Sequence, residues 1–348
     1  MNKKKKILIA PLDWGLGHTT RCIPIIVALL ERGHEVFTCG NKNTQLIFKQ
    51  KFPELNHIII DGYNVKYGHR KSQAISMMLQ TPKFLRTIYK ERKTAEKIAN
   101  QLELDFIISD NRFGFRSSRT TNIFITHQIH IQGPSWVKPI FYKVNTNYIK
   151  RFNHCWIPDY EYNNNLSGLL SQDPKPNNCV FIGPLSRFNQ PAKSHNYKYK
   201  YLAILSGPEP QRTIFEKLII KQLIKEDEKC IIIGGKPKGN DFIKNNILYF
   251  NHLNDLKFKE AIEESKHIIC RAGYSSIMDL SILQKDALLI PTPGQTEQEY
   301  LAKYHKEKSG INWQQQDKFK LNGKEEYGKI SPSSENHLLE KALITIGI

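Results

Sequence analysis

Residues 268–304 repeat one structural pattern twice, and this repeat restricts the fold of the chain more than any other feature. An apolar run leads into a polar turn at 271–279 and then a helical stripe. A second apolar run, 287–290, leads into a polar turn at 293–299 and another helix. Alternating strands and helices are typical of a parallel α/β sheet. Ligands of such sheets bind beyond the carboxyl ends of the strands, so we expect one site to draw on both turns.

The two turns carry polar residues in a specific order. Gly273 is followed six residues later by Asp279, and Pro291 precedes the sequence Glu297-Gln298-Glu299. This order resembles the nucleotide-sugar signature of the GT-B glycosyltransferases of family 28. The alternative is an ordinary βαβ unit whose helices start with polar residues. The resemblance implies that Asp279 binds the ribose hydroxyls and that Gln298 and Glu299 bind the sugar, within a donor site that also includes Arg271, Gly273, Ser275, Ser276 and Glu297. Ser275 and Ser276 are also expected to cap the helix, because hydroxyl oxygens accept hydrogen bonds from first-turn N–H groups.

The amino-terminal region opens with an apolar strand, 7–10, a glycine-containing loop, 11–21, and an apolar helix, 23–30. Glycines let the backbone approach a ligand closely and expose N–H groups at a helix start. The loop lacks G-x-G-x-x-G, so it does not predict a dinucleotide site. It resembles the glycine loop of the family 28 transferases, with one glycine fewer. The resemblance implies an acceptor loop formed by Asp13, Gly15, Gly17 and Thr19, together with Arg112 after a later strand.

His18 ends the glycine-containing turn and is the first candidate for a catalytic base. An imidazole with an ordinary pKa near 6.5 accepts a proton at neutral pH, and the family carries a histidine at this place. The alternative is a helix-capping or core histidine. Asp110 and His127 are the second candidates for the base or for acceptor contact, because both follow strands whose carboxyl ends meet at one edge of the sheet.

A second strand–loop–helix unit begins at 201–205, after a polar linker without apolar periodicity. The family usually has a glycine-rich phosphate-binding loop at this place. Two prolines in the loop of this chain remove backbone donors. The anion is therefore predicted to contact Ser206, Gly207, Arg212 and Thr213, and the guanidinium fork of Arg212 matches phosphate oxygens.

The composition predicts a folded protein of about two domains, because the chain has 348 residues and 40% hydrophobic residues. No apolar run approaches the ~20 residues that span a bilayer, and the apolar run after the lysine cluster 3–6 is too short for a signal peptide. We therefore expect a cytoplasmic protein, with peripheral contact at the inner face of the membrane left open. The six cysteines lie far apart and form no C-x-x-C pair, so they predict buried, reduced thiols.

The net charge of +18 is concentrated in residues 1–195, which hold 28 Lys and Arg against 13 Asp and Glu. This half is where an anionic partner is expected. Residues 64–101 are both basic and amphipathic, which suits a membrane interface but equally suits a solvated helix over a core. A nucleic-acid partner is the remote alternative, because the chain has no helix-turn-helix, zinc-finger or RNP signature.

We predict an α/β protein of GT-B architecture, with two Rossmann-like domains whose parallel sheets face a central cleft. Residues 1–190 are expected to bind the acceptor, 191–334 the nucleotide sugar, and 335–348 to form a terminal helix that packs on the first domain. The expected reaction is sugar transfer from a nucleoside diphosphate donor, such as UDP-N-acetylglucosamine, to a hydroxyl of a glycan- or lipid-linked acceptor. We expect no cofactor and no essential metal, because no Asp-x-Asp pair is suitably placed. The alternative is a nucleotide-sugar hydrolase of a nonulosonic acid pathway, whose opening loop also has the form G-x-G-H-x-x-R.

Overall fold

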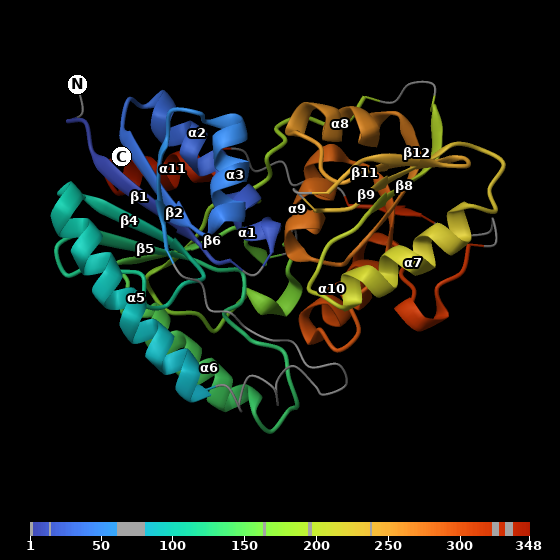
Figure 1. Cartoon of the computed structure of the whole chain (residues 1–348). Helices are drawn as coiled ribbons and strands as arrows, with labels where there is room; N and C mark the ends of the chain where they lie inside the picture. Colours follow the sequence, from blue (N-terminus) through green and yellow to red (C-terminus); the bar gives the residue numbers. More distant parts are fainter. Residues whose placement is uncertain are drawn as a thin grey trace. The chain divides into compact units, whose positions relative to one another are not determined.

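The computed structural model describes residues 3–13, 15–60, 81–162, 165–193, 197–236, 239–321, 327–330 and 337–348. The chain divides into two compact domains (Figure 1). The first contains the described residues up to Ser186 together with those after residue 336, and the second contains the described residues from Arg187 to Ile330. Both are α/β domains, so the predicted fold class of two Rossmann-like domains is confirmed.

The first domain is built on a seven-stranded sheet in which every neighbouring pair is parallel. Its order is β3-β2-β1-β4-β5-β6-β7, which contains the Rossmann order 3-2-1-4-5-6. The central strand β1 is apolar after Lys6, and its residues 7–10 are fully buried, as expected of a strand that is covered on both faces. The strands are β1 (Lys6–Pro11), β2 (Glu35–Gly40), β3 (Asn56–Ile59), β4 (Phe106–Asp110), β5 (Thr121–Ile125), β6 (His154–Ile157) and β7 (Cys179–Phe181).

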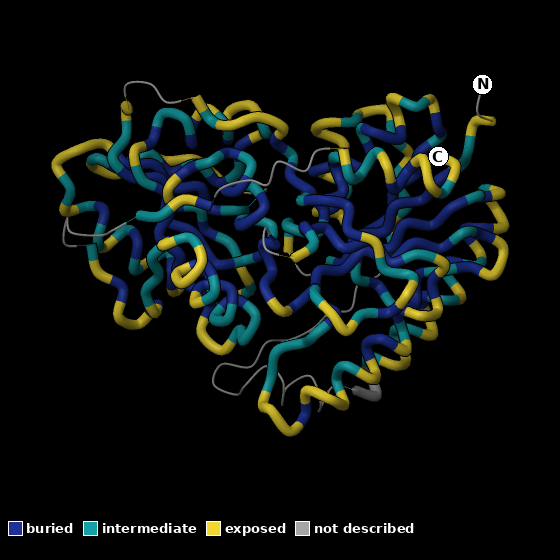
Figure 2. Tube along the Cα trace, turned by 180° about the vertical axis from the view of Figure 1, so that it is seen from behind, coloured by how far each residue is buried: buried dark blue, intermediate teal, exposed yellow. Residues whose placement is uncertain are grey.

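Helices cover this sheet, and their apolar faces complete its core (Figure 2). Ala95, Ile98 and Ala99 of α5 pack against apolar residues of the central strands. The terminal helix α11 belongs to this domain, where Glu340 forms an ion pair with Arg32. The helices are α1 (Leu16–Arg21), α2 (Ile23–Glu31), α3 (Lys42–Lys51), α5 (Thr81–Leu102), α6 (Lys138–Ile149), the 3-10 helix η2 (Gly168–Leu170) and α11 (Leu338–Thr345).

The second domain repeats the arrangement with a sheet of order β10-β11-β9-β8-β12-β13-β14. The five inner strands are parallel, whereas the edge strands β10 and β14 pair antiparallel with their neighbours. We did not predict these two edge strands, which are only three and two residues long. The strands are β8 (Tyr199–Ile204), β9 (Cys230–Ile233), β10 (Phe242–Lys244), β11 (Ile247–Phe250), β12 (Ser265–Cys270), β13 (Asp286–Leu289) and β14 (Gly328–Lys329).

The helices of the second domain follow the strands in the alternation that the sequence predicts. They are α7 (Gln211–Leu223), α8 (Asp255–Glu263), α9 (Tyr274–Leu283), α10 (Thr296–Ser309) and the 3-10 helix η3 (Gln316–Lys318). One local prediction is wrong, because the N-cap of α9 is Gly273 and no side chain caps it. Ser275 and Ser276 instead lie inside the first turn of α9. The N–H groups of this turn therefore have no capping side chain, a point that bears on anion binding.

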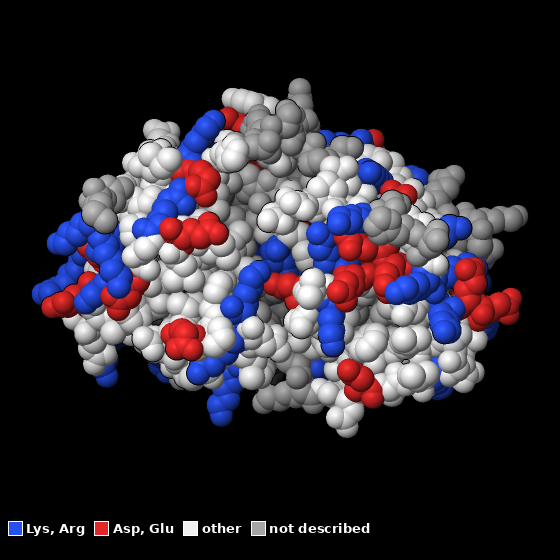
Figure 3. Space-filling view, turned by 90° about the horizontal axis from the view of Figure 1, so that it is seen from above, with Lys and Arg blue, Asp and Glu red and all other residues white. Residues whose placement is uncertain are grey.

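Two further sequence predictions concern surface charge and cysteines. On the face shown in Figure 3, Lys and Arg side chains alternate with Asp and Glu instead of forming one continuous basic surface. All six cysteines are free thiols; five are buried and Cys179 is partly buried. Of the basic stretch 64–101, residues 64–80 lie outside the described residues. Within the described part of the chain, no helix is long and apolar enough to cross a membrane.

Candidate active site

The candidate active site of the first domain lies where the strand order of its sheet reverses, between β1 and β4. Pro11 and Asp110, the last residues of these two strands, are register partners. Ligand sites of open α/β sheets form at this switch point. The loop after β1 turns through Gly15, whose φ of 97° favours glycine, and enters α1. This turn brings His18 of α1 to the end of β4.

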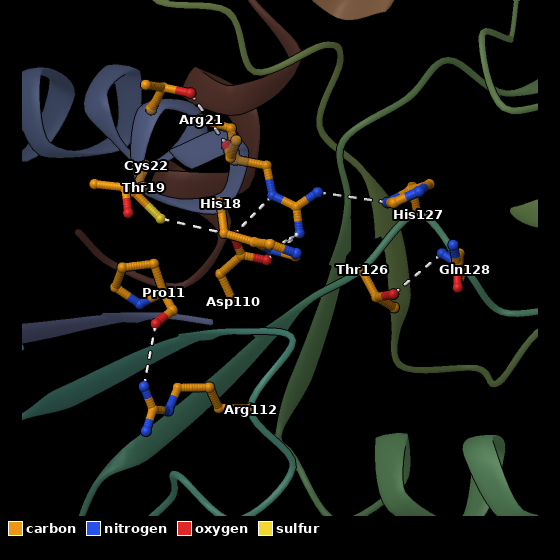
Figure 4. Close-up of polar contacts among 12 residues, drawn as sticks. Pro11, His18, Thr19, Arg21, Cys22, Asp110, Arg112, Thr126, His127 and Gln128 are labelled. Carbon is orange, nitrogen blue, oxygen red and sulfur yellow. Dashed lines mark hydrogen bonds and ion pairs between the residues drawn. The ribbon is translucent and has the colours of Figure 1, made fainter. Parts of the chain in front are cut away.

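Three side chains meet at this point: His18, Arg21 and Asp110 (Figure 4). Nδ1 of His18 lies 3.1 Å from Oδ2 of Asp110. Arg21 Nε donates to the same carboxylate oxygen at 2.7 Å, and its Nη2 donates to Oδ1. Asp110 and Arg21 are buried, whereas 16% of the His18 side chain is exposed. The structure therefore makes His18 the member of the cluster that a ligand can reach.

The cluster admits two tautomers of His18, because Arg21 Nη2 also lies 2.9 Å from His18 Nδ1. When Nδ1 carries the proton, it donates to the Asp110 carboxylate and leaves Nε2 as a proton acceptor. When Nε2 carries the proton, Nδ1 accepts from Arg21 instead. Only the first tautomer is a base at Nε2, the arrangement of an aspartate-oriented histidine.

Burial and charge set the protonation of this cluster. Burial lowers the pKa of His18, the Arg21 guanidinium lowers it further, and the Asp110 carboxylate partly opposes both. For Asp110, burial raises the pKa, but Arg21 and His18 outweigh burial and bring the pKa to about 2. The geometry therefore holds a carboxylate beside a neutral imidazole at neutral pH.

His127 lies on the other side of Arg21 and is the third predicted catalytic residue that the structure places here (Figure 4). Its Nδ1 lies 3.5 Å from Arg21 Nη1, and its side chain is buried. We did not predict Arg21 as a site residue, although it ends the G-x-G-H-x-x-R loop. The spacing of three residues, one helical turn, was the signal that His18 and Arg21 share a face of α1.

The predicted acceptor-loop residues fall in different environments. Asp13 and Gly17 are partly exposed and Gly15 is exposed, whereas Thr19 is buried with its hydroxyl 3.4 Å from that of Thr44. Arg112 differs most from its prediction. Its guanidinium is buried, donates through Nε to Glu91 Oε1 at 2.6 Å and through Nη1 to the Pro11 carbonyl at 3.3 Å. Arg112 is therefore not placed to contact an acceptor.

In the second domain, the two polar turns that the sequence singled out lie together. A Cβ added to Gly273 would lie 4.0 Å from Nε2 of Gln298, although the two residues come from different turns. Gln298 is buried and its Oε1 accepts from the Thr292 N–H at 2.8 Å. Glu299 Oε1 accepts from the Gly294 N–H at 3.1 Å. The expected juxtaposition at the carboxyl edge of the sheet is thus present.

Thr292 is a polar residue of this edge that we did not predict. Its side chain is 1% exposed, and Oγ1 has no hydrogen-bond partner within the described residues. A Cβ added to Gly207 would lie 3.4 Å from this oxygen. Gly207 has a φ of 101°, so the loop after β8 also requires glycine here. Buried hydroxyl groups usually have partners, so this one, beside a glycine turn, is a candidate for contact with a ligand.

Asp279, the predicted ribose ligand, lies on α9 and is 19% exposed. Its Oδ2 is 3.7 Å from Nε of Arg187, and the Nη1 of Arg187 is 3.2 Å from Oδ1 of Asp255. The Arg187 guanidinium also lies 4.1 Å from the centre of the Phe258 ring. Arg187 was not predicted from the sequence, because its partners are 68 and 92 positions away.

Two arginines predicted to bind the donor are instead buried in internal networks. Arg212 Nη1 donates to the Gly234 carbonyl at 2.9 Å, and the guanidinium pairs with Glu209 and Glu216. Arg271 Nη1 donates to the Ile290 carbonyl at 3.1 Å and its Nη2 to Gln316 Oε1 at 2.6 Å. Glu209 Oε2 also accepts from the Thr213 N–H at 3.2 Å, whereas Ser206 is partly exposed. Of these predicted ligands, Gly207 is exposed, Ser206 and Thr213 are partly exposed, and both arginines are buried.

Comparison with known proteins supports the predicted resemblance of the second domain to family 28 glycosyltransferases. Residues 217–324 match the glycosyltransferase family 28 C-terminal domain, and this range includes Asp279, Gln298 and Glu299. The second domain therefore carries the family 28 match, and the chain as a whole has a GT-B fold. Two uncharacterized glycosyltransferases are similar to it. The one from Methanosarcina mazei is 26% identical, over 52% of this chain and 51% of the relative. The one from Methanosarcina acetivorans is 25% identical, over 84% and 79%.

Solved structures with low sequence identity share the GT-B fold of this chain. The glycosyltransferase of kitacinnamycin has a TM-score of 0.61 at 12% identity, over 92% of this chain and 88% of that one. MurG of Acinetobacter baumannii has a TM-score of 0.53 at 12% identity, over 99% and 91%. UGT89C1 of Arabidopsis thaliana, complexed with UDP-L-rhamnose, has a TM-score of 0.59 at 13% identity, over 97% and 89%.

In the described part of the chain, no group of three or more His, Cys, Asp or Glu is arranged to hold a metal ion.

Proposed function

We propose that this protein transfers a sugar from a nucleoside diphosphate donor, a UDP-sugar such as UDP-N-acetylglucosamine, to a hydroxyl of a glycan- or lipid-linked acceptor. The single observation that carries the proposal is the 3.1 Å contact between His18 Nδ1 and Asp110 Oδ2 at the switch point of the first sheet. A histidine oriented by a buried carboxylate can act as a general base. Acceptor hydroxyls require such a base, because their own pKa is far above neutral pH.

The proposed chemistry follows from this geometry. His18 Nε2 takes the proton of the acceptor hydroxyl, and the oxygen of that hydroxyl forms a bond to the anomeric carbon of the sugar. The bond between that carbon and the diphosphate oxygen breaks, and the nucleoside diphosphate leaves. Asp110 stabilises the imidazolium that forms, and the two hydrogen bonds from Arg21 keep the carboxylate ionised and correctly oriented.

The donor is proposed to bind at the carboxyl edge of the second sheet. The first turn of α9 has no capping side chain, so its N–H groups and the positive end of the helix dipole are available to a diphosphate. The unpaired Thr292 hydroxyl beside Gly207 adds a buried polar group that itself needs a partner. Asp279 is proposed to bind the ribose, and Gln298 with Glu297 and Glu299 the sugar. The fold is shared with structures that contain UDP-L-rhamnose and thymidine diphosphate, which supports a nucleoside diphosphate donor.

The acceptor is proposed to be presented at an anionic membrane surface. On α5, Leu85 is 50% and Tyr89 is 61% exposed. The neighbouring cations Arg86, Lys90 and Lys93 are also exposed, and the ammonium of Lys93 lies 4.7 Å from the centre of the Tyr89 ring. Exposed aromatic and aliphatic residues among cations suit a headgroup interface. This contact would give the protein a peripheral position at the cytoplasmic face.

The function can be tested in two steps. A thermal-shift panel of nucleotides and nucleotide sugars should raise the apparent Tm for the donor class, because ligands that bind only the folded state stabilise it. The donor identified in this way is then incubated with and without candidate glycan and lipid-linked acceptors. Transfer requires nucleoside diphosphate release that depends on the acceptor. Release at the full rate without an acceptor would replace the proposal with a hydrolase, and no shift with any nucleotide would overturn it.

A further inference from the structure

The loop that follows Asp110 is held by contacts with α5, and these contacts have no role in the proposed mechanism. Arg112 lies two residues after Asp110, and its Nε donates to Glu91 Oε1 of α5 at 2.6 Å. Both side chains are buried, with at most 5% exposed. The same guanidinium donates through Nη1 to the carbonyl of Pro11, the register partner of Asp110. One buried ion pair therefore joins α5 to the ends of both strands that form the switch point.

The backbone from residue 109 to residue 114 is held by several contacts, so a shift of Arg112 would also move Asp110. Ser109 Oγ donates to the Arg112 carbonyl at 2.7 Å, and Asn111 has a left-handed φ of 60°. The N–H of Gly114 donates to Glu91 Oε2 at 3.3 Å. A Cβ on Gly114 would lie 2.3 Å from the Ile88 carbonyl oxygen of α5, so the loop and the helix are in direct contact. The turn that carries Asp110 thus has little freedom while the ion pair is present.

Stability alone is a weak reason for this arrangement. Taking two charges out of water costs about as much as their attraction returns, so replacing a buried ion pair by apolar residues of similar size is often neutral or stabilising. An ion pair does differ from apolar packing in direction, because a guanidinium with defined hydrogen bonds fixes the position of its neighbours. The pair is therefore suited to hold geometry rather than to add stability.

We propose that the buried ion pair between Glu91 and Arg112 positions the Asp110 carboxylate, and through it His18, for proton transfer. The proposal rests on the proposed function of His18 as a base. Glu91 and Arg112 are positioning residues, since neither side chain is placed to touch a substrate. The pair also connects α5, the helix that bears Tyr89, Lys90 and Lys93, with the end of β4. A surface contact of α5 and the geometry of His18 and Asp110 therefore both depend on this ion pair.

The deciding experiment compares two double variants of the full-length protein. E91L/R112M replaces the pair by apolar side chains of similar length. The matched control, R92M/E96L, removes a second ion pair of 2.7 Å on α5 whose members also contact this loop, at Arg116, Ser117 and Ser118. These contacts lie farther from Asp110 along the chain. Both variants are first checked for a cooperative unfolding transition like that of the wild type.

Two readouts are then taken. Turnover of E91L/R112M should fall by about 10²-fold with the donor KM unchanged, the size expected for a catalytic group misplaced by about 1 Å, whereas R92M/E96L should keep wild-type turnover. The second readout needs no substrate: the imidazole ¹H–¹⁵N spectrum of His18, assigned through its absence in H18Q, should change in E91L/R112M and not in the control. If the wild type shows no transfer, the function proposal fails while the spectrum still tests the positioning.

The proposal is overturned if folded E91L/R112M has an unchanged His18 spectrum, because positioning predicts that Asp110 moves. Wild-type turnover in that variant would overturn it equally. If E91L/R112M does not fold, R112K serves in its place, since a lysine keeps the charge but lacks the fork that reaches both Glu91 and Pro11. The same two readouts, with the same expected directions, then decide.

Discussion

Arg21 and Asp110 form a buried ion pair at the carboxyl end of β4, in which Arg21 Nε lies 2.7 Å from Asp110 Oδ2. Neither side chain is more than 3% exposed. The pair explains how a carboxylate remains ionised in the interior, because burial alone would raise its pKa. It also places a fixed positive charge next to His18, which favours the neutral imidazole that a general base requires.

Replacing Asp110 with Asn should destabilise the protein by about 3–5 kcal/mol, because Arg21 remains as a buried charge without its carboxylate. The pKa of Asp110 is lowered from 3.8 to about 2, so its stabilising effect is complete above pH 3.8 and is lost as the pH falls toward 2. Urea unfolding of wild type and D110N at several pH values measures both effects. Equal free energies of unfolding at pH 7 would contradict a stabilising pair.

Replacing His18 with Ala should reduce turnover by about 10²–10⁴-fold, the usual loss for a general base. UDP affinity should be unchanged, since the residues proposed to bind the donor belong to the other domain. Turnover assays with titration calorimetry of UDP separate the two quantities. A larger loss in H127A, with H18A near wild type, would transfer the role of base to His127.

The pH dependence of turnover should report His18. Its pKa is lowered from 6.5 by burial first and by Arg21 second, so the neutral imidazole predominates at pH 6.5 and the proton is gained at lower pH. Turnover should therefore be level around pH 7 and should fall on the acid side below 6.5. The profile of kcat/KM between pH 5 and pH 8 measures this, because kcat/KM reports the pKa of the free enzyme. An acid limb centred above pH 6.5 would contradict the buried, arginine-adjacent environment.

Replacing Asp279 with Ala should weaken UDP binding by about 1–3 kcal/mol if its carboxylate accepts hydrogen bonds from the ribose. Arg187 retains a carboxylate partner in this variant, because Asp255 lies 3.2 Å from its Nη1. Titration calorimetry with UDP and uridine provides the control, since loss of a ribose contact should weaken both ligands equally. Unchanged affinity for both would remove Asp279 from the site.

Binding to acidic vesicles should fall in the variant R86Q/K90Q/K93Q and should weaken as salt rises, because surface charges are screened. The control K217Q/K221Q/K225Q removes the same charge from exposed positions on and just after α7. Vesicle co-sedimentation at several salt concentrations measures the difference. Equal binding to neutral and acidic vesicles, or equal losses in both variants, would argue against an α5 interface.

Much of the fold could be predicted because it depends on short-range pattern. Short apolar runs such as 7–10 and 268–270 predict buried strands, and helices between such strands predict a parallel sheet. The carboxyl ends of parallel strands lie at one edge of the sheet. The sequence was therefore enough to assign His18 and Asp110 to one sheet edge and Gly273 and Gln298 to another. These assignments follow from chain order and strand direction alone.

The partners of charged side chains could not be predicted in this way. Arg112, Arg212 and Arg271 looked available for a ligand, yet each is buried and bound to groups from other elements. Arg21 and Asp110 are 89 positions apart, and only the pairing of β1 with β4 brings α1 to that carboxylate. Chain order is thus enough to assign the candidate sites to two sheet edges. Which charges are neutralised internally depends on the folded chain, because burial and distance, not residue type, set the cost of leaving a charge unpaired.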